Sequence, residues 1–477
     1  MDWTYSTPEE CGVKSAGLIA FLRDMQEKRL HMHALMVLRH GKPIAQARFA
    51  PWDEAQPHML YSLSKSFTST AVGFAVQEGL LRTDDRLVSF FPEYFPAPPC
   101  ENMQKITVKH LLTMNTGHEV EPMLMGPDWE GNFLHSYVPH EPGTHFLYNT
   151  AATYMLSAIL QKVTGRKLID YLREKLLAPL HMSGDIWFEE SPSGVAAGGF
   201  GLNVRVEDIA KLGQFYLQKG MWEGRQLLDP KWIEAAQTPW SDNSANDPST
   251  PDWRAGYGYQ FWMCRPEKVF RGDGAFGQYC VILPEQDMVV AINSGVRDMQ
   301  AVLTSLWENV LPCVGDAEAP GADADALSQA LRAPVTRADW EENGEAAEPP
   351  VPDPAWYGEY DVSENEGKLE RIGVSAQGLV FTVNGKPARI PLDRDQWQAC
   401  TVEGALDTFP SRHAGLYRDT AVRAARQGDS LRMHFCHTAT PFEDVMTLRF
   451  TAHGLTLEGH RNAGFADAGY KLVGVRE

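Results

Sequence analysis

The chain has 477 residues, of which 43% are hydrophobic and 10% aromatic. It is long enough for two or three globular domains, and this composition excludes an intrinsically disordered protein. The formal net charge of −19 argues against nucleic acid or an anionic membrane as partner. The beginning of the chain has no basic segment followed by an apolar run, and the seven scattered cysteines contain no C-x-x-C pair. We therefore expect a cytoplasmic protein with free thiols and no membrane span.

The first part of the chain mixes strand and helix patterns. Residues 33–53 predict two strands around a turn at 40–43, the first of them almost wholly apolar, as in a central strand. Apolar residues at helical spacing predict four helices, over 64–81, 106–119, 150–165 and 206–220. The short β-rich segments "GYGYQFWMC", "FGQYCVILPE" and "DMVVAINSG" predict antiparallel strands, and 299–314 predicts a closing helix. This order predicts an α+β domain over 1–314 whose sheet takes strands from both ends of the domain.

The last third of the chain has a different composition. Residues 315–353 are rich in Ala, Asp, Glu and Pro, which is typical of a linker, with room for a short helix in the middle. From 354 to 477 strand patterns dominate, and Asn384-Gly385 between two β-rich runs predicts a hairpin. We expect a separate all-β sandwich or barrel there. The sequence leaves open whether this domain covers a cleft, binds a partner or forms a homodimer.

The segment "YSLSKS", residues 61–66, raises the question of a nucleophile. Ser62 is the only serine followed three residues later by lysine, Lys65. On a helix, residues i and i+3 share a face, so the amine lies beside the hydroxyl, and a buried lysine can be neutral enough to accept its proton. The alternative is that Ser62 or Ser64 caps a helix and Lys65 is solvated.

Other hydrolase signatures are absent from the sequence. It contains no G-x-S-x-G, H-E-x-x-H or phosphate-binding glycine loop, and "HEPGTH" at 140–145 reads as a turn instead of a zinc site. We therefore expect neither a metal nor a cofactor.

Five segments in order resemble one family. They are "LYSLSKSFTSTAVGFAVQEGLLRTDDRLVSFFPE", "ITVKHLLTMNTGHE", "EPGTHFLYNTAATYMLSAILQKVTG", "GGFGLNVRVEDIAKLGQFYLQKGMWEG" and "FRGDGAFGQYCVILPEQDMVV". Together they resemble the serine β-lactamase and penicillin-binding-protein superfamily over about residues 5–312, and are most similar to class C β-lactamase-like esterases and amidases. The resemblance implies an α+β fold with an antiparallel sheet flanked by helices and an all-helical subdomain, followed here by the small all-β domain.

The resemblance also implies roles for particular residues. Ser62 would be the nucleophile, with Lys65 and Tyr148 sharing the role of base. The tyrosine belongs to a Y-x-N motif, matched by Tyr148-Asn149-Thr150, where Thr150 stands in the place of the usual asparagine. The backbone N–H groups of Ser62 and Ala275 would bind the oxyanion.

The third family motif, K-T-G or H-x-G, is matched by Gly272-Asp273-Gly274, which lacks the cation. Arg271 precedes it, but on a strand its side chain would point to the opposite face. We therefore expect a substrate without the carboxylate of a penicillin. Asn149, Thr150 and the triplet are expected to bind substrate. Trp262, Phe276 and Gln278 either line the acyl or leaving-group pocket or pack in the core.

These residues predict a serine hydrolase that cleaves a small ester or amide through an acyl-enzyme on Ser62. One alternative is a true β-lactamase or D,D-peptidase, against which Thr150, Gly272 and the lack of a secretory signal argue. Another is a catalytically inactive binding or sensor protein whose β domain is the working part. The joint presence of Ser62, Lys65 and Tyr148 argues against that second alternative.

Overall fold

The computed structural model describes residues 3–476 apart from 54–55, 316–321, 333, 366, 403–418 and 466–468. Its first part is built on a six-stranded antiparallel sheet in the order β2-β1-β11-β10-β9-β8. The strands are β1 (Met32–Arg39), β2 (Lys42–Arg48), β8 (Trp262–Met263), β9 (Phe270–Gly274), β10 (Gln278–Leu283) and β11 (Met288–Ser294). The expected sheet from both ends of the 1–314 segment is confirmed, and the turn expected at 40–43 is present but limited to His40 and Gly41, because β2 begins at Lys42. In "GYGYQFWMC" only Trp262 and Met263 form a strand, so that prediction is wrong for most of the segment.

Both faces of this sheet are covered, which explains why β1 is almost wholly apolar. Its eight residues are all buried. Leu35 and Val37 belong to one core with α1 (Ser15–Glu27) and α11 (Met299–Ser305). Met36 and Leu38 belong to the other core, on the side where α9 (Val206–Leu217) packs against β1, β10 and β11. Alternate side chains of one strand therefore stabilise two layers of helices.

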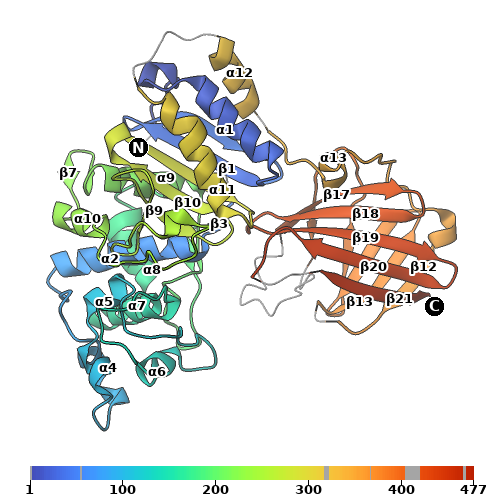
Figure 1. Cartoon of the computed structure of the whole chain (residues 1–477). Helices are drawn as coiled ribbons and strands as arrows, with labels where there is room; N and C mark the ends of the chain where they lie inside the picture. The colour runs from blue at the N-terminus through green and yellow to red at the C-terminus, as the bar shows by residue number, and fades with distance from the viewer. Residues whose placement is uncertain are drawn as a thin grey trace.

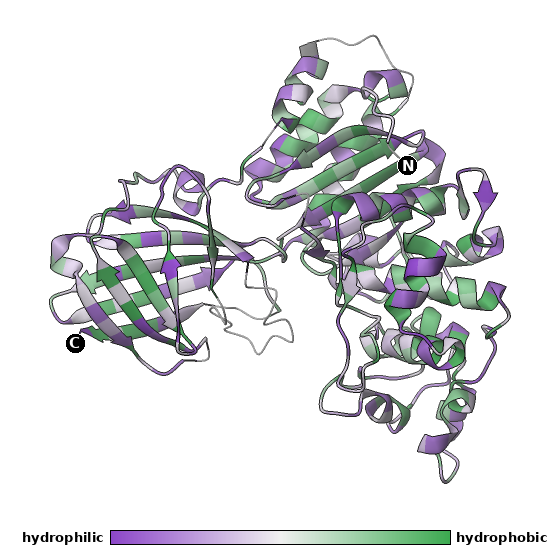
Figure 2. Cartoon of the chain, turned by 180° about the vertical axis from the view of Figure 1, so that it is seen from behind, coloured by the Kyte–Doolittle hydropathy of each residue, from purple (hydrophilic) through white to green (hydrophobic). Residues whose placement is uncertain are grey.

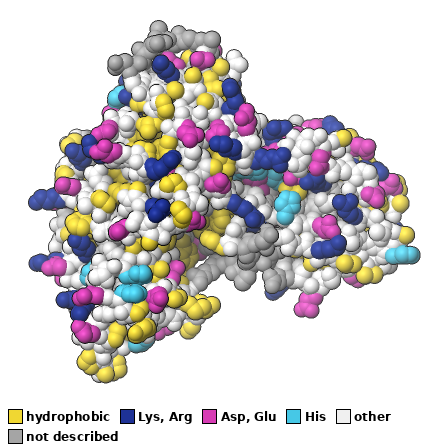
Figure 3. Space-filling view, viewed as in Figure 1, with side chains coloured by type: hydrophobic (Ala, Val, Ile, Leu, Met, Phe, Trp, Pro, Cys, Tyr) yellow, Lys and Arg dark blue, Asp and Glu magenta, His cyan; other side chains and the backbone are white. Residues whose placement is uncertain are grey.

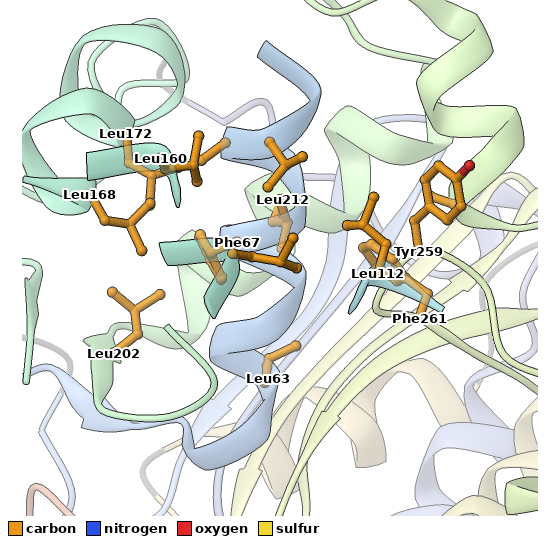
Figure 4. Close-up of a cluster of buried hydrophobic side chains, with 14 of the residues drawn as sticks. Leu63, Phe67, Leu112, Leu160, Leu168, Leu172, Leu202, Leu212, Tyr259 and Phe261 are labelled. Atoms are coloured by element: carbon orange, nitrogen blue, oxygen red, sulfur yellow. The ribbon is translucent and has the colours of Figure 1, made fainter. Parts of the chain in front are cut away.

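A helical region lies beyond α9 and contains the candidate nucleophile. Helix α2 (Ser64–Gln77) runs through its centre, packed against α7 (Thr150–Thr164) and α8 (Leu168–Leu172). Figure 4 shows Phe67 of α2, and Leu63 just before this helix, among leucines from neighbouring elements. Smaller helices complete the region: α3 (Leu87–Phe90), α4 (Glu101–Lys105), α5 (Val108–Leu112), α6 (Trp129–Leu134) and α10 (Pro230–Ala236).

The structure corrects several helix boundaries. The helix expected over 106–119 is only α5, which ends at Leu112 because Thr113 leaves the helical conformation. The helix expected over 150–165 is confirmed, with Gly165 in the left-handed conformation after its last residue. The closing helix continues from α11 as a π-helical turn over Leu306–Val310 and a 3-10 turn over Leu311–Cys313.

The segment after residue 314 is more than a spacer. It contains α12 (Ala322–Leu331), which packs against α1, and α13 (Asp339–Glu342). Among the described residues, no helix is both long enough and apolar enough to cross a membrane.

The C-terminal part is a ten-stranded antiparallel sheet that curls into a barrel beside the first part (Figure 1). Its strand order is β15-β14-β13-β12-β21-β20-β19-β18-β17-β16. The strands are β12 (Gly358–Val362), β13 (Leu369–Ser375), β14 (Gly378–Val383), β15 (Lys386–Ile390), β16 (Gln398–Thr401), β17 (Asp419–Gln427), β18 (Ser430–His437), β19 (Glu443–Thr451), β20 (Gly454–Arg461) and β21 (Tyr470–Arg476). Hydrophilic and hydrophobic residues alternate along many of them (Figure 2), as expected for strands with one buried face. The hairpin at Asn384-Gly385 is present between β14 and β15.

Candidate active site

The segment before α2 places Ser62 on a strained turn. Tyr61 has a φ of +48°, an unfavourable conformation for a bulky residue, and it begins a 3-10 turn over Tyr61–Leu63. Ser62 therefore lies just before the α-helix and not within its first turn. The i, i+3 relation still holds, because Lys65 Nζ lies 3.0 Å from Ser62 Oγ. Ser62 is partly exposed, whereas Lys65 is only 1% exposed.

The other two serines of the segment have structural partners. Ser64 Oγ accepts a hydrogen bond from the backbone N–H of Leu202 at 3.1 Å. Ser66 Oγ donates to the carbonyl of Gln260 at 2.9 Å. Both side chains are buried. Ser62 is therefore the one serine of the three whose hydroxyl combines exposure with contact to the amine.

Lys65 sits in an environment that favours its neutral form. Burial lowers the pKa of its amine from 10.5 to about 7, and the carboxylates of Glu121 and Asp273 oppose that change. Besides Ser62, Nζ contacts Thr150 Oγ1 at 3.3 Å and the carbonyl of Gly199 at 2.7 Å. A neutral amine has two N–H donors and one lone pair. It can donate to Gly199 and Thr150 and still accept the proton of Ser62.

The ring of Tyr148 also lies close to the amine of Lys65. Its centroid is 4.8 Å from Lys65 Nζ, and the ring stacks on Trp262 at 5.1 Å. Burial raises the pKa of the Tyr148 hydroxyl well above 10, and the charge of Asp273 adds to the effect. Tyr148 is therefore a phenol at neutral pH, able to donate a proton but not poised to take the first one.

The residues after Tyr148 divide into two roles. Asn149 is buried and its Oδ1 accepts the backbone N–H of Ala152, so it caps the start of α7. The expectation that Asn149 binds substrate is not supported by this position. Thr150 is partly exposed and reaches Lys65, as described above.

The Gly272-Asp273-Gly274 strand packs against the turn that carries Ser62. A Cβ at Gly272 would lie 2.5 Å from both Leu63 Cδ1 and Ser66 Oγ. At Gly274 it would lie 1.9 Å from the backbone oxygen of Leu60. Glycine is needed at both positions for this close approach. This close approach also brings Ala275, the residue after Gly274, to the turn that carries Ser62. The N–H of Ala275 is expected to bind the oxyanion there.

Arg271 does not replace the missing cation. Its side chain is fully buried and points away from the face of Gly272, as expected from strand geometry. The guanidinium pairs with Asp273 Oδ2 at 2.9 Å, donates to the carbonyl of Asp252 at 2.9 Å and lies over Trp253 at 4.4 Å. The carboxylate of Asp273 is thus neutralised by a neighbour inside the protein, instead of being presented to a substrate.

Three residues were expected either to line the substrate pocket or to pack in the core, and the structure buries all three: Trp262, Phe276 and Gln278. Trp262 is 5% exposed and stacks on the ring of Tyr148. Gln278 is fully buried, and its Nε2 donates to the carbonyl of Ser294 at 2.7 Å and to that of Phe276 at 3.3 Å. Gln278 therefore holds the loop around Ala275 and does not line a cleft. Phe276 is 6% exposed and packs against Tyr61.

Two residues at the site were missed by the sequence reasoning. The carbonyl of Gly199 is the shortest contact of Lys65, and the "GGFG" run at 198–201 was the available signal. Glu121 lies on an exposed loop, and its Oε1 accepts the N–H of Thr150 at 2.5 Å and of Ala151 at 3.3 Å. A carboxylate at the N-terminal end of α7 is favoured by the helix dipole. No local pattern marks Glu121.

The fold agrees with the comparisons to known proteins. Residues 19–305 match the Beta-lactamase family, and the chain belongs to it. It is a hydrolase of the β-lactamase family, as the expected superfamily resemblance implied. It is similar to the 6-aminohexanoate-dimer hydrolase of Paenarthrobacter ureafaciens, with 26% identity over 313 residues, 60% of this chain and 78% of that protein.

Solved structures show the same fold. A penicillin-binding-protein homologue from Caulobacter crescentus aligns with a TM-score of 0.52 and 17% identity, over 65% of this chain and 100% of that one. SurE aligns with a TM-score of 0.51 and 18% identity, over 87% of this chain and 97% of that one. The alignment with SurE covers a larger share of this chain than residues 19–305, the part that matches the family.

Proposed function

We propose that this protein cleaves a small ester or amide through an acyl-enzyme on Ser62. The observation that carries the proposal is the 3.0 Å contact between Ser62 Oγ and the buried amine of Lys65, whose pKa is lowered to about 7. An amine with this pKa is a suitable general base at neutral pH. The other serines of the segment lack such a partner, because they bond to backbone groups.

The proposed reaction uses each side chain once in each half. Lys65 takes the proton of Ser62 as the hydroxyl oxygen attacks the carbonyl carbon. The backbone N–H groups of Ser62 and Ala275 stabilise the oxyanion. Tyr148 then gives its proton to the leaving alcohol or amine, and the proton that Lys65 took from Ser62 restores the Tyr148 hydroxyl. Water attacks the acyl-enzyme with the same groups acting in reverse. Because the pKa of Tyr148 is raised, Lys65 and not Tyr148 is proposed as the first base.

The site favours substrates that lack a carboxylate beside the scissile bond. Position 272 is glycine, and Arg271 pairs with Asp273, so neither offers a cation. An exposed charge beside the site is the carboxylate of Glu121, which accepts the N–H of Thr150. The likeness to a 6-aminohexanoate-dimer hydrolase supports hydrolysis of an uncyclised amide over that of a β-lactam.

The test compares three substrates with purified wild-type and Ser62→Ala protein. We expect the wild type to hydrolyse p-nitrophenyl acetate and a short linear amide, and Ser62→Ala to lose both activities by at least about 10³-fold. Retained activity in Ser62→Ala would overturn the assignment of the nucleophile. Fast turnover of a chromogenic cephalosporin without esterase activity would show a true β-lactamase. Failure of the wild type on all three would favour a binding protein.

A further inference from the structure

Side chains from the barrel reach the segment that carries Ser62. Phe442 and Phe465 belong to the two barrel loops that follow β18 and β20. Both rings contact Tyr61, at 6.3 and 5.9 Å between centroids, and Phe276, at 5.4 and 4.9 Å. Tyr61 directly precedes Ser62, and Phe276 directly follows Ala275. The aromatic cluster of these four residues therefore flanks both backbone groups proposed to bind the oxyanion.

Hydrogen bonds to the first part of the chain hold described residues of the two barrel loops in place. The N–H of Met59, two residues before Tyr61, donates to the carbonyl of Ala439 at 2.9 Å. Asn462 Nδ2 donates to the carbonyl of Gly295 at 2.9 Å, and Arg297 Nε donates to the carbonyl of Asn462 at 3.0 Å. The position of the loops is therefore set by polar contacts with named partners, in addition to the aromatic packing.

A buried carboxylate, that of Glu443, also joins the barrel to the first part of the chain. Glu443, the first residue of β19, is 1% exposed, and its Oε1 lies 2.8 Å from His31 Nδ1 of the first part. Its Oε2 lies 2.8 Å from His434 Nε2 of the barrel. On the face shown in Figure 3, histidine and basic side chains gather where the two parts meet. The barrel is thus seated by specific contacts next to the candidate site.

Phe465 differs from the rest of the aromatic cluster in its exposure. Tyr61, Phe276 and Phe442 are between 5% and 9% exposed, whereas Phe465 is 79% exposed. It presents most of an apolar ring to solvent beside the proposed oxyanion groups. The exposed ring rests on the rings of Tyr61 and Phe276, and aromatic rings contribute strongly to binding energetics.

We propose that Phe465, supported by Tyr61 and Phe276, forms a subsite for an aryl or alkyl acyl group of the substrate. This rests on the proposed function. The acyl side is chosen because Tyr148, the proposed proton donor to the leaving group, packs on Trp262 and Tyr257, which are outside the aromatic cluster. The leaving group must face Tyr148, which leaves the acyl group to face the cluster. The barrel then contributes to substrate selection.

The test uses two esters with the same leaving group, p-nitrophenyl acetate and p-nitrophenyl octanoate. The variants are Phe465→Ala, which removes an exposed ring without opening a core cavity, and Phe465→Trp. The control is Tyr5→Ala, which removes an aromatic ring that is 62% exposed beside β2, at the opposite edge of the sheet from β8 and β9. We expect Phe465→Ala to lower kcat/KM for octanoate by about tenfold and for acetate by less than about twofold. Phe465→Trp and Tyr5→Ala should keep the octanoate-to-acetate ratio of the wild type.

Two results would overturn the subsite. One is an unchanged kcat/KM of Phe465→Ala for both esters, and the other is an equal loss for both esters, which would indicate a general disturbance of the site. Failure of the proposed function has a different signature: either the wild type would hydrolyse neither ester, or Ser62→Ala would hydrolyse both as fast as the wild type.

Discussion

The pH dependence of hydrolysis tests the role of Lys65 most closely. If Lys65 is the base, kcat/KM for a neutral ester follows the fraction of neutral amine. With a pKa of about 7, about nine-tenths of the amine is neutral at pH 8 and about 1% at pH 5. An ordinary pKa of 10.5 would leave only about 0.03% neutral at pH 7. The lowering corresponds to about 5 kcal/mol against the ammonium form. We therefore expect kcat/KM to fall about tenfold per pH unit below pH 7.

A change at Glu121 tests the direction of the effect. The charge of Glu121 raises the pKa of Lys65, so Glu121→Gln should lower it and move the acid limb of the profile to lower pH. Because Glu121 is exposed, we expect a displacement of less than about one pH unit. Glu119→Gln removes a nearby exposed charge that has no such effect on Lys65, and it should leave the limb in place. The reasoning is refuted by a flat wild-type profile from pH 5.5 to 9, or by a limb that moves to higher pH in Glu121→Gln.

Three further predictions concern other parts of the account. Tyr148→Phe should lower kcat by about 10²–10⁴-fold, since the proton donor is lost, while the thermal midpoint stays close to that of the wild type. Gly272→Lys should not create a carboxylate-binding site. It should lower the free energy of unfolding by about 1–3 kcal/mol in a urea titration, whereas Gly184→Ala, which faces open space, should change it by less than about 0.5 kcal/mol. Glu443→Gln should destabilise the chain most between pH 4.5 and 6.5. The contribution of Glu443 is lost as pH falls through its lowered pKa, and that of His31 as pH rises from 6.5 through its raised pKa. A pH-independent difference in urea midpoints would contradict this.

Local patterns predicted the α+β class and the contact between the side chains of Ser62 and Lys65, whereas the role of Ser62 as nucleophile rested on the family resemblance. The Ser62–Lys65 spacing places the two side chains together even though Ser62 lies on a 3-10 turn, because both kinds of helix bring residues i and i+3 close. The apolar run of β1 predicted a central strand, and the structure buries it on both faces. These features depend on sequence neighbours, so they are readable without the fold.

Features that depend on long-range contacts could not be read from the sequence. Glu121 is 29 residues from Thr150 along the chain, and Phe465 is about 400 residues from Tyr61. The segment around Tyr257 has the composition of a strand, but its aromatic rings pack into a core with Tyr148 and Trp262 and leave most of it irregular. Tertiary packing overrides strand propensity in such a segment. Contacts of this kind decide specificity, so the substrate is the part least accessible to sequence reasoning.

Covalent labelling tests the central claim most directly. Wild-type protein and the Ser62→Ala, Ser64→Ala and Ser66→Ala variants are treated with a fluorophosphonate, and the adduct is located by intact mass and peptide mapping. The account predicts one adduct per chain on Ser62, its absence from Ser62→Ala, and labelling of correctly folded Ser64→Ala and Ser66→Ala. An adduct on another residue, or undiminished labelling of Ser62→Ala, would contradict it.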